Sequence, residues 1–246
     1  MGAMDVFDDL AAEDERLDRI LAALNDDAWR SPSGAPGWCI ADVVLHLAQT
    51  DEAVASSAGA SAAERGWPAD ASGVDDAADR MVREQRAEPA EVFTRWRAAQ
   101  QASVSALRDA EPGTRLPWVA GSLKPTTLAT TRLAEHWAHG LDITGPLGID
   151  FPDTDRLRHV AWLGHSTLPY AFSLEGEEAH PVYCRLNGPD GETWTFGPEE
   201  AESSIVGLAG SFCRVGAHRL APEDAALIAS GPYGPTALRL LRNYAA

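Results

Sequence analysis

The sequence predicts an α bundle followed by a small α+β domain. Up to about residue 176 the apolar residues recur every three or four positions, which is the spacing of one helix face. After Gly176 the pattern changes to short runs of β-branched and aromatic residues separated by turn residues. A chain of 246 residues is long enough for two such domains. We therefore predict a helical domain over residues 1–176 and an α+β domain over residues 177–246.

Two helices are predicted before residue 60. The first covers residues 6–24, where apolar and acidic residues alternate at helical spacing, and the stretch SPSGAPGW (31–38) ends it. The second covers residues 39–58 and has Asp42 in its first turn, where the helix dipole favours a carboxylate. Residues 60–88 are rich in Ala, Asp and Gly, and we predict a loop there with one short helix around residues 77–86.

Three more helices complete the predicted helical domain. The third begins at Pro89, because proline is favoured at the first helical position, and it continues to about residue 110. The fourth covers residues 127–143 and is expected to stop at Gly145 and Pro146, because proline cannot donate the hydrogen bond that continues a helix. The fifth covers residues 153–172.

The C-terminal domain is predicted to begin with a hairpin. The runs VYCRLNG (182–188) and ETWTFG (192–197) favour β structure, and PDG between them is typical of a turn. A helix over residues 202–219, a short strand near residues 224–230 and a last helix over residues 235–245 are predicted to follow.

The charge of the chain argues against two classes of partner. The net charge is −17, with acidic residues spread along the chain, and such a surface repels phosphate backbones and anionic lipid. We therefore expect no nucleic acid and no membrane partner. Because no apolar run approaches the roughly 20 residues that cross a bilayer and no signal region is visible, we expect a cytoplasmic protein. We expect it to be a monomer or a homodimer. Its cysteines form no C-x-x-C pair and are expected to be free.

The stretch RLAEHWAHGLDI (132–143) places one carboxylate and two imidazoles within five positions of the predicted fourth helix. On a helix Glu135 and His139, four residues apart, project within about 40° of each other and one turn apart, so they can hold one ion together. His136 points about 100° away from Glu135 and forms a poorer pair with His139. Helix geometry therefore favours Glu135 with His139.

Two interpretations of this helix face remain open. Glu135 and His139 lie nearly opposite the apolar stripe that contains Leu133 and Trp137, which is usual for side chains that are simply solvated. His46, beside the core stripe of the second helix, can however supply a third donor. Two histidines and one carboxylate bind Zn²⁺ or Fe²⁺ and leave positions open for water or substrate. Facing helices of a bundle can carry such a site.

The segments PGWCIADVVLHLAQTD (36–51) and EHWAHGLDI (135–143) resemble the signature segments of the DinB-like metalloprotein superfamily and, within it, of the mycothiol-dependent maleylpyruvate isomerase family. The matching positions are Trp38, His46, Glu135 and His139. VYCRLNGPDGETWTFG and SFCRVGAHR are similar to the small C-terminal domain of many actinobacterial members, whereas residues 60–88 carry no such likeness. The resemblance implies a four-helix bundle with a small α+β domain after it, and His46, Glu135 and His139 as metal ligands.

The resemblance also implies a reaction. A divalent metal, expected to be Zn²⁺, would bind a low-molecular-weight thiol, mycothiol, and present its thiolate to a small-molecule substrate, so we expect a thiol transferase or isomerase. Two alternatives stay open. One is a thiol-independent isomerase, cyclase or hydrolase that uses the metal as a Lewis acid, and the other is a protein that binds a metal or ligand without turnover.

Further residues are candidates around the metal. Asp142, one turn after His139, can accept a hydrogen bond from the N–H of that imidazole. A position in water at the end of the helix is an equally good interpretation of Asp142. His136 is a candidate for supporting the ligands or facing the substrate, but an exposed position is favoured for it. An acidic substrate would need nearby cations, for which the candidates are Lys124, Arg132, Arg214 and Arg219. Arg214 and Arg219 belong to the tail domain, which we predict to cover the metal site.

Overall fold

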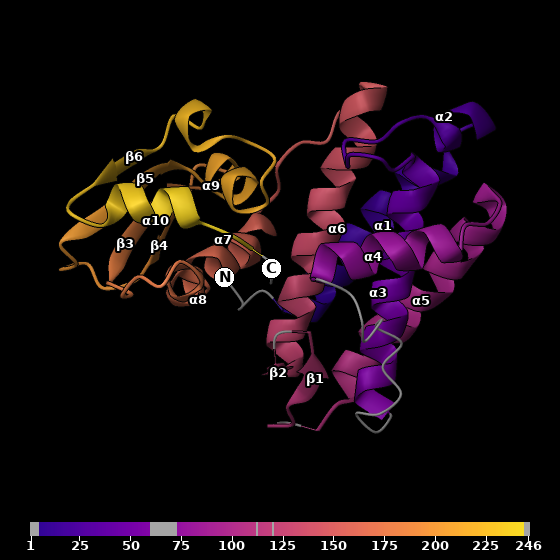
Figure 1. Cartoon of the computed structure of the whole chain (residues 1–246), viewed down its shortest axis with the longest axis horizontal. Helices are drawn as coiled ribbons and strands as arrows, with labels where there is room; N and C mark the ends of the chain where they lie inside the picture. The colour runs from indigo at the N-terminus through magenta and orange to yellow at the C-terminus, as the bar shows by residue number, and fades with distance from the viewer. Residues whose placement is uncertain (1–4, 60–72, 112, 120, 244–246) are drawn as a thin grey trace. The chain divides into compact units, whose positions relative to one another are not determined.

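The computed structural model describes residues 5–59, 73–111, 113–119 and 121–243. The chain forms two compact units, of which the first ends at Phe151 and the second begins at Pro152 (Figure 1). The first unit is helical and the second is mixed, so the predicted fold class, an α bundle plus an α+β domain, is confirmed. The boundary between the units thus lies earlier in the sequence than residue 176. The helices between residues 152 and 176 belong to the second unit because they contact its later helices.

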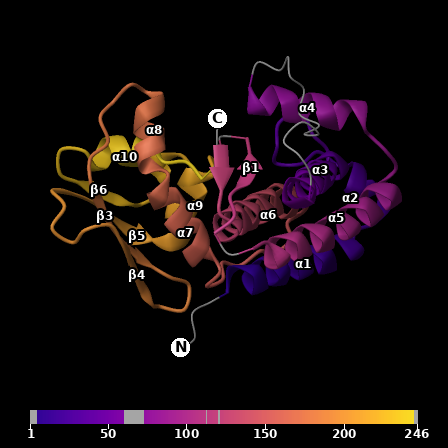
Figure 2. The same cartoon turned by 90° about the horizontal axis from the view of Figure 1, so that it is seen from below.

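The first unit is a bundle of four long helices that pack on one another, α1, α3, α5 and α6 (Figure 2). Its elements are α1 (Val6–Ala22), α2 (Asp26–Arg30), α3 (Ile40–Gly59), α4 (Val74–Glu84), α5 (Pro89–Asp109), β1 (Leu116–Trp118), β2 (Gly121–Leu123) and α6 (Pro125–Leu147). Helix α2 and the β1–β2 hairpin were not predicted. Fully buried apolar side chains such as Ile40, Val44, Leu47 and Trp96 form the core. Over the described residues, no helix has the length and apolar character that crossing a bilayer requires.

Helix α4 lies outside the bundle, against α3 (Figure 2). Arg86, just after α4, donates two hydrogen bonds to the carboxylate of Asp42, at 2.8 and 2.9 Å. Asp42 Oδ2 also accepts the backbone N–H of Cys39 at 3.0 Å. One carboxylate therefore caps the first turn of α3 and fixes the end of α4. The helix predicted around residues 77–86 is thus present but begins earlier, and residues 60–72 of the predicted loop lie outside the described residues.

Helix α6 continues through Pro146 to Leu147, so the helix end predicted before Pro146 is wrong. Proline has no N–H to donate to the carbonyl of Asp142, four residues earlier. That carbonyl accepts the N–H of Gly34 instead, at 2.7 Å. The loop before α3 thus replaces the missing hydrogen bond, and α6 ends only at Gly148, whose φ of 64° is the left-handed conformation typical of a helix C-terminus.

The second unit packs helices against a four-stranded sheet with the order β4-β3-β5-β6. Its elements are α7 (Leu157–Ser166), α8 (Leu168–Leu174), β3 (Val182–Asn187), β4 (Thr193–Phe196), β5 (Ser203–Leu208), α9 (Ala209–Gly216), β6 (Ile228–Ser230) and α10 (Gly234–Leu240), with a 3₁₀ turn at Pro222–Asp224. The predicted β3–β4 hairpin is confirmed. The single helix predicted over residues 153–172 is two helices, and these contact α9 and α10 respectively.

Residues 203–208, predicted as the first part of a helix, form the inner strand β5. This strand runs parallel to β3, with Ile205 opposite Cys184, and both residues are fully buried. A strand inside a sheet reads as a short apolar run, which hydrophobic spacing alone does not distinguish from a buried helix segment. The helix that the sequence indicates begins only at Ala209.

Candidate metal centre

The three predicted metal ligands lie together although they come from distant parts of the sequence. His46 belongs to α3, and Glu135 and His139 belong to α6. One donor atom of each residue lies within 4.8 Å of the other two. Glu135 Oε2 is 3.8 Å from His46 Nε2 and 3.5 Å from His139 Nε2. Glu135 therefore directs one carboxylate oxygen toward both imidazoles, that of His139 on its own helix and that of His46 on α3.

The face of α6 that carries Glu135 and His139 is not a solvated face, so that interpretation was wrong. His46 and His139 are each 9% exposed, and the Glu135 side chain is 29% exposed. Helix α6 contacts α1, α3 and α5, which leaves little of its circumference to water. Glu135 is thus the most accessible of the three donors, and the site is open to solvent on its side.

Trp38, in the loop before α3, covers the two histidines. Its ring centroid is 5.2 Å from that of His46 and 6.4 Å from that of His139, and it is nearly parallel to the latter ring, with 27° between the planes. The indole Nε1 donates to Asp79 Oδ1 of α4 at 3.0 Å. The tryptophan of the signature segment is therefore held by α4 and shields the imidazoles from water.

Asp142 takes the first of the two positions expected for it. Its Oδ2 is 2.9 Å from His139 Nδ1, and the residue is 2% exposed rather than in water. Because an ionised carboxylate can only accept, Nδ1 donates to Asp142, and in the neutral imidazole the lone pair of His139 then lies on Nε2, the nitrogen that faces Glu135. The arrangement leaves the correct nitrogen free to bind an ion.

Burial and mutual contacts set the charges of the three donors. Burial raises the pKa of Glu135, but the contacts with His139 and His46 prevail and hold it well below its usual range. Burial lowers the pKa of His46, and the nearby His139 lowers it further. Burial also lowers the pKa of His139, but its contacts with Asp142 and Glu135 outweigh burial and raise it. The site therefore combines an anionic carboxylate with two imidazoles, which is a donor set that suits a cation.

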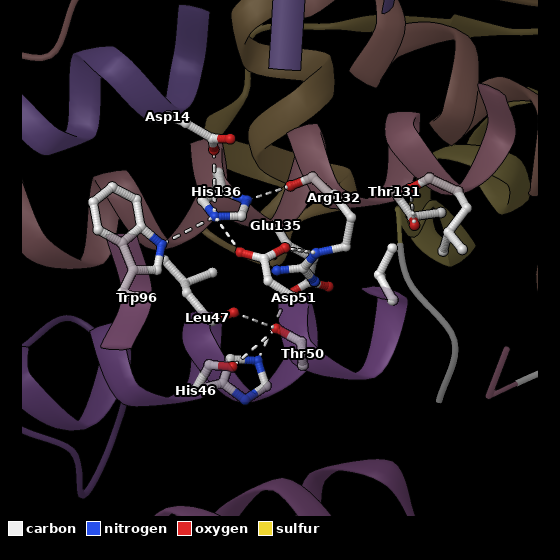
Figure 3. Close-up of polar contacts among 12 residues, drawn as sticks. Asp14, His46, Leu47, Thr50, Asp51, Trp96, Thr131, Arg132, Glu135 and His136 are labelled. Atoms are coloured by element: carbon white, nitrogen blue, oxygen red, sulfur yellow. Dashed lines mark hydrogen bonds and ion pairs between the residues drawn. The ribbon is translucent and has the colours of Figure 1, made fainter. Parts of the chain in front are cut away.

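His136 is buried, whereas the sequence favoured an exposed position. It is 1% exposed, and its Nε2 lies 3.1 Å from Asp51 Oδ2 and 3.4 Å from Asp14 Oδ1 (Figure 3). Its Nδ1 donates to the carbonyl of Arg132 at 2.9 Å. Burial lowers the pKa of His136, but Asp14 and Asp51 together raise it to about 9. The two carboxylates therefore favour the protonated ring, and His136 is not among the three clustered donors.

A buried charge cluster joins three helices and consists of Asp14 of α1, Asp51 of α3, and Arg132 and His136 of α6. The sequence had indicated only Arg132 and His136 as candidates. Arg132 Nε lies 3.0 Å from Asp51 Oδ1. Burial raises the pKa of Asp14 to about 7, despite His136. Burial also acts to raise the pKa of Asp51, but Arg132 and His136 outweigh it and hold that pKa below its usual range. Asp51 lies in the polar run QTDE (49–52) and Asp14 in the acidic stretch AAEDER (11–16), so neither carboxylate stands out in the sequence.

Two of the other cationic candidates, Arg214 and Arg219, have local partners. Arg214 donates two hydrogen bonds of 2.8 Å to Asp153, and Arg219 Nη1 donates to the carbonyl of Ala217 at 2.7 Å. All of these residues belong to the second unit. Lys124 is the residue before the first turn of α6. That the tail domain covers the metal site stays a prediction.

The spacing of the donors fits a tetrahedral ion. Nitrogen and oxygen ligands about 2.0–2.1 Å from Zn²⁺ are about 3.3 Å apart in a tetrahedron. The two distances from Glu135 Oε2, 3.5 and 3.8 Å, are slightly longer, and all three donor atoms lie within 4.8 Å of one another, so an ion held by all three would draw them closer together through side-chain rotations. Three protein donors leave one position for another ligand.

Known proteins share this site region and this fold. Residues 10–144 match the mycothiol maleylpyruvate isomerase N-terminal domain. An uncharacterised protein of Mycobacterium tuberculosis, found in strains CDC 1551 / Oshkosh and ATCC 25618 / H37Rv, is 39% identical over 212 residues, which cover 83% of this chain and 81% of that protein. The matched regions are large enough to show common descent rather than a shared motif.

Two solved structures extend the likeness in fold to most of the chain. They are crystal structures of the mycothiol-dependent maleylpyruvate isomerase and of a mutant of it, each with a TM-score of 0.61 and 14% identity over 92% of this chain and 91% of that one. The family match runs from α1 to α6, includes Trp38 and all three clustered donors, and spans more than half of the 246 residues. The chain therefore belongs to the mycothiol maleylpyruvate isomerase family.

Proposed function

We propose that His46, Glu135 and His139 bind one divalent metal ion, and that this ion is Zn²⁺. The observation that carries the proposal is the convergence of one donor atom from each residue within 4.8 Å. The contact of Asp142 with His139 supports it, because histidines that bind metals commonly donate their other N–H to a carboxylate. Two nitrogens and one carboxylate suit Zn²⁺ or Fe²⁺ better than Mg²⁺ or Ca²⁺, which prefer oxygen ligands.

We further propose that the protein uses a low-molecular-weight thiol, mycothiol, in the isomerisation of a small molecule or in transfer of the thiol to it. The family to which the chain belongs supports this, since a solved structure with the same fold is that of a mycothiol-dependent maleylpyruvate isomerase. A bound divalent ion would supply one element of this chemistry, because coordination lowers the pKa of a thiol enough for the thiolate to be present at neutral pH.

The residues of the chain have separate tasks in this proposal. Glu135 brings a negative charge to the donor set and offsets part of the charge of a cation. Asp142 fixes the tautomer and the orientation of His139. Trp38 covers the imidazoles and keeps water from that side, which strengthens electrostatic interactions within the site. The substrate and thiol would approach from the side of Glu135, the most exposed of the three donors.

Metal analysis followed by calorimetry tests both parts of the proposal. Protein prepared without an affinity tag should contain close to one Zn²⁺ per chain after reconstitution, and titration with mycothiol should then show tight binding to the metal form only. Less than about a tenth of an ion per chain would refute the metal site. A bound metal with no affinity for the thiol would refute the thiol proposal and favour a Lewis-acid enzyme or a binding protein.

Alanine variants assign the donors. His46→Ala or His139→Ala should abolish stoichiometric metal, because each removes one of three donors. His180→Ala is the matched control, since this histidine stacks on Tyr233 in the second unit and is not among the three clustered donors. If His180→Ala lost the ion while His139→Ala retained it, the assignment would be wrong.

A further inference from the structure

The buried charge cluster joins the two helices that carry the candidate metal donors. Asp51 of α3 receives Arg132 Nε on one carboxylate oxygen, at 3.0 Å, and faces His136 Nε2 with the other, at 3.1 Å (Figure 3). Both partners belong to α6. All three residues are at most 2% exposed. The carboxylate of Asp51 thus accepts a hydrogen bond from Arg132 and forms an ion pair with His136, and these two residues are one turn apart on the neighbouring helix.

These contacts lie close to the donors along both helices. Asp51 follows His46 by little more than one turn of α3, and Arg132 and His136 stand on either side of Glu135 on α6. A shift of one helix along the other by a single residue would move the donors by about 1.5 Å. Such a shift would be enough to separate His46 Nε2 from Glu135 Oε2 beyond the reach of one ion.

Stability alone does not explain the cluster. Buried ion pairs often stabilise a protein no better than apolar residues of similar volume, because removing charges from water is costly. Three atoms of the cluster, Arg132 Nη2, Asp51 Oδ2 and Asp14 Oδ1, are moreover buried with no hydrogen-bond partner, which is a further cost. Apolar side chains specify the register of two helices through their shape alone, whereas a buried carboxylate with two cationic partners one turn apart on the other helix favours one register.

We propose that Asp51 is a positioning residue, which sets the register of α3 against α6 through Arg132 and His136 and so spaces His46 for an ion shared with Glu135 and His139. The inference rests on the metal site of the proposed function. Asp14 offers an internal comparison, because it faces the same imidazole, Nε2 of His136, from α1, which carries none of the three donors.

Paired substitutions of the two aspartates test the proposal. Asp51→Asn and Asp14→Asn each remove one buried carboxylate that faces His136, so both are expected to lower the melting temperature of the metal-free protein. Only Asp51→Asn should weaken metal binding, by about 10- to 100-fold as for other residues that support metal ligands. Chelator competition measures the affinity, and the absorption spectrum of the Co²⁺ form reports whether the donor geometry has changed.

The outcomes separate this inference from the metal site itself. If the unaltered protein binds no ion, the proposed function is refuted and this inference with it. If it binds the ion and Asp51→Asn binds equally well, or loses no more affinity than Asp14→Asn, only the positioning role is refuted. Should Asp51→Asn fail to fold, a variant with the whole cluster replaced by apolar residues serves instead (Asp14→Val, Asp51→Val, Arg132→Met and His136→Leu). It is expected to fold and still bind the ion at least 10-fold more weakly, and unchanged affinity in it would refute the proposal.

Discussion

Gly34→Ala is predicted to disturb the metal site without touching any donor. Gly34 has no side chain, which allows its backbone N–H to reach the carbonyl of Asp142 at 2.7 Å. A Cβ at this position would lie 3.0 Å from Asp142 Cα and 3.0 Å from Asp142 Oδ1. Both distances are shorter than ordinary contacts between carbon and these atoms, and one of them involves the backbone of a helix, so the loop or Asp142 must move.

The structure gives the size of this effect. Extra atoms in a well-packed place cost about 1–3 kcal/mol, and loss of the Gly34 hydrogen bond would add about 1 kcal/mol. Together these terms give a loss of about 2–4 kcal/mol, which should lower the melting temperature of a unit of this size by about 4–16 °C. Because Asp142 also holds His139 Nδ1, metal affinity should fall by about 10-fold, even though the His139 side chain is intact.

Thermal unfolding of the metal-free and metal-loaded forms, with chelator competition for the affinity, checks this prediction. Pro36→Ala is the control, because Pro36 is an exposed residue of the same loop, and a change below about 1 kcal/mol is expected from the greater freedom of the unfolded chain. An unchanged melting temperature and metal affinity in Gly34→Ala would show that the contact with Asp142 does not couple the loop to the site.

Three further changes are predicted to have measurable effects. Asp42→Asn should lower the free energy of unfolding by about 1 kcal/mol at pH 7 and make that free energy fall less steeply on acidification. Burial raises the pKa of Asp42, but the contact with Arg86 outweighs it and holds the pKa below its usual range. The stabilisation by Asp42 is therefore present at neutral pH and is lost as the pH falls through its folded-state pKa. Titration of unfolding against pH measures both. Trp38→Phe should remove most of any change in tryptophan fluorescence on metal binding, and a full response in it would show that another tryptophan reports the ion. Gly210→Ala should destabilise the second unit by about 1–3 kcal/mol, because its Cβ would overlap Asp153 Oδ2 and displace the carboxylate that pairs with Arg214. Denaturant unfolding measures this loss.

The pairing of Glu135 with His139 could be predicted because the information for it is local. Glu135 and His139 are four residues apart, and a helix of any environment places such residues on one face. His46 was proposed as a third donor from its place beside the core stripe of the second helix, and the resemblance of its segment to a known family supported this choice. The interpretation that these side chains are simply solvated was wrong. It rests on the contrast between a polar and an apolar helix face, and that contrast assumes that water covers one side of the helix.

Helix α6 has little such side, since α1, α3 and α5 surround it. Its polar residues are accepted in the interior because groups on other helices compensate them. Asp51 and Asp14 supply the negative charges for Arg132 and His136, and these come from α3 and α1. The sequence of α6 contains no information on these partners, so no reading of that helix by itself could have placed His136 in the core.

The error at Pro146 has the same origin and leads to the site. A proline ends a helix when the carbonyl that it leaves free has no other donor. Here the donor is Gly34, in the loop that also carries Trp38. The contact of this loop with α6 therefore allows the helix to continue past Pro146. Gly34 packs against Asp142 and so fixes one end of the segment that positions the Trp38 ring beside His139. A local rule failed at Pro146 because a tertiary contact, built around the candidate metal site, supplies the hydrogen bond that the rule assumes is lost.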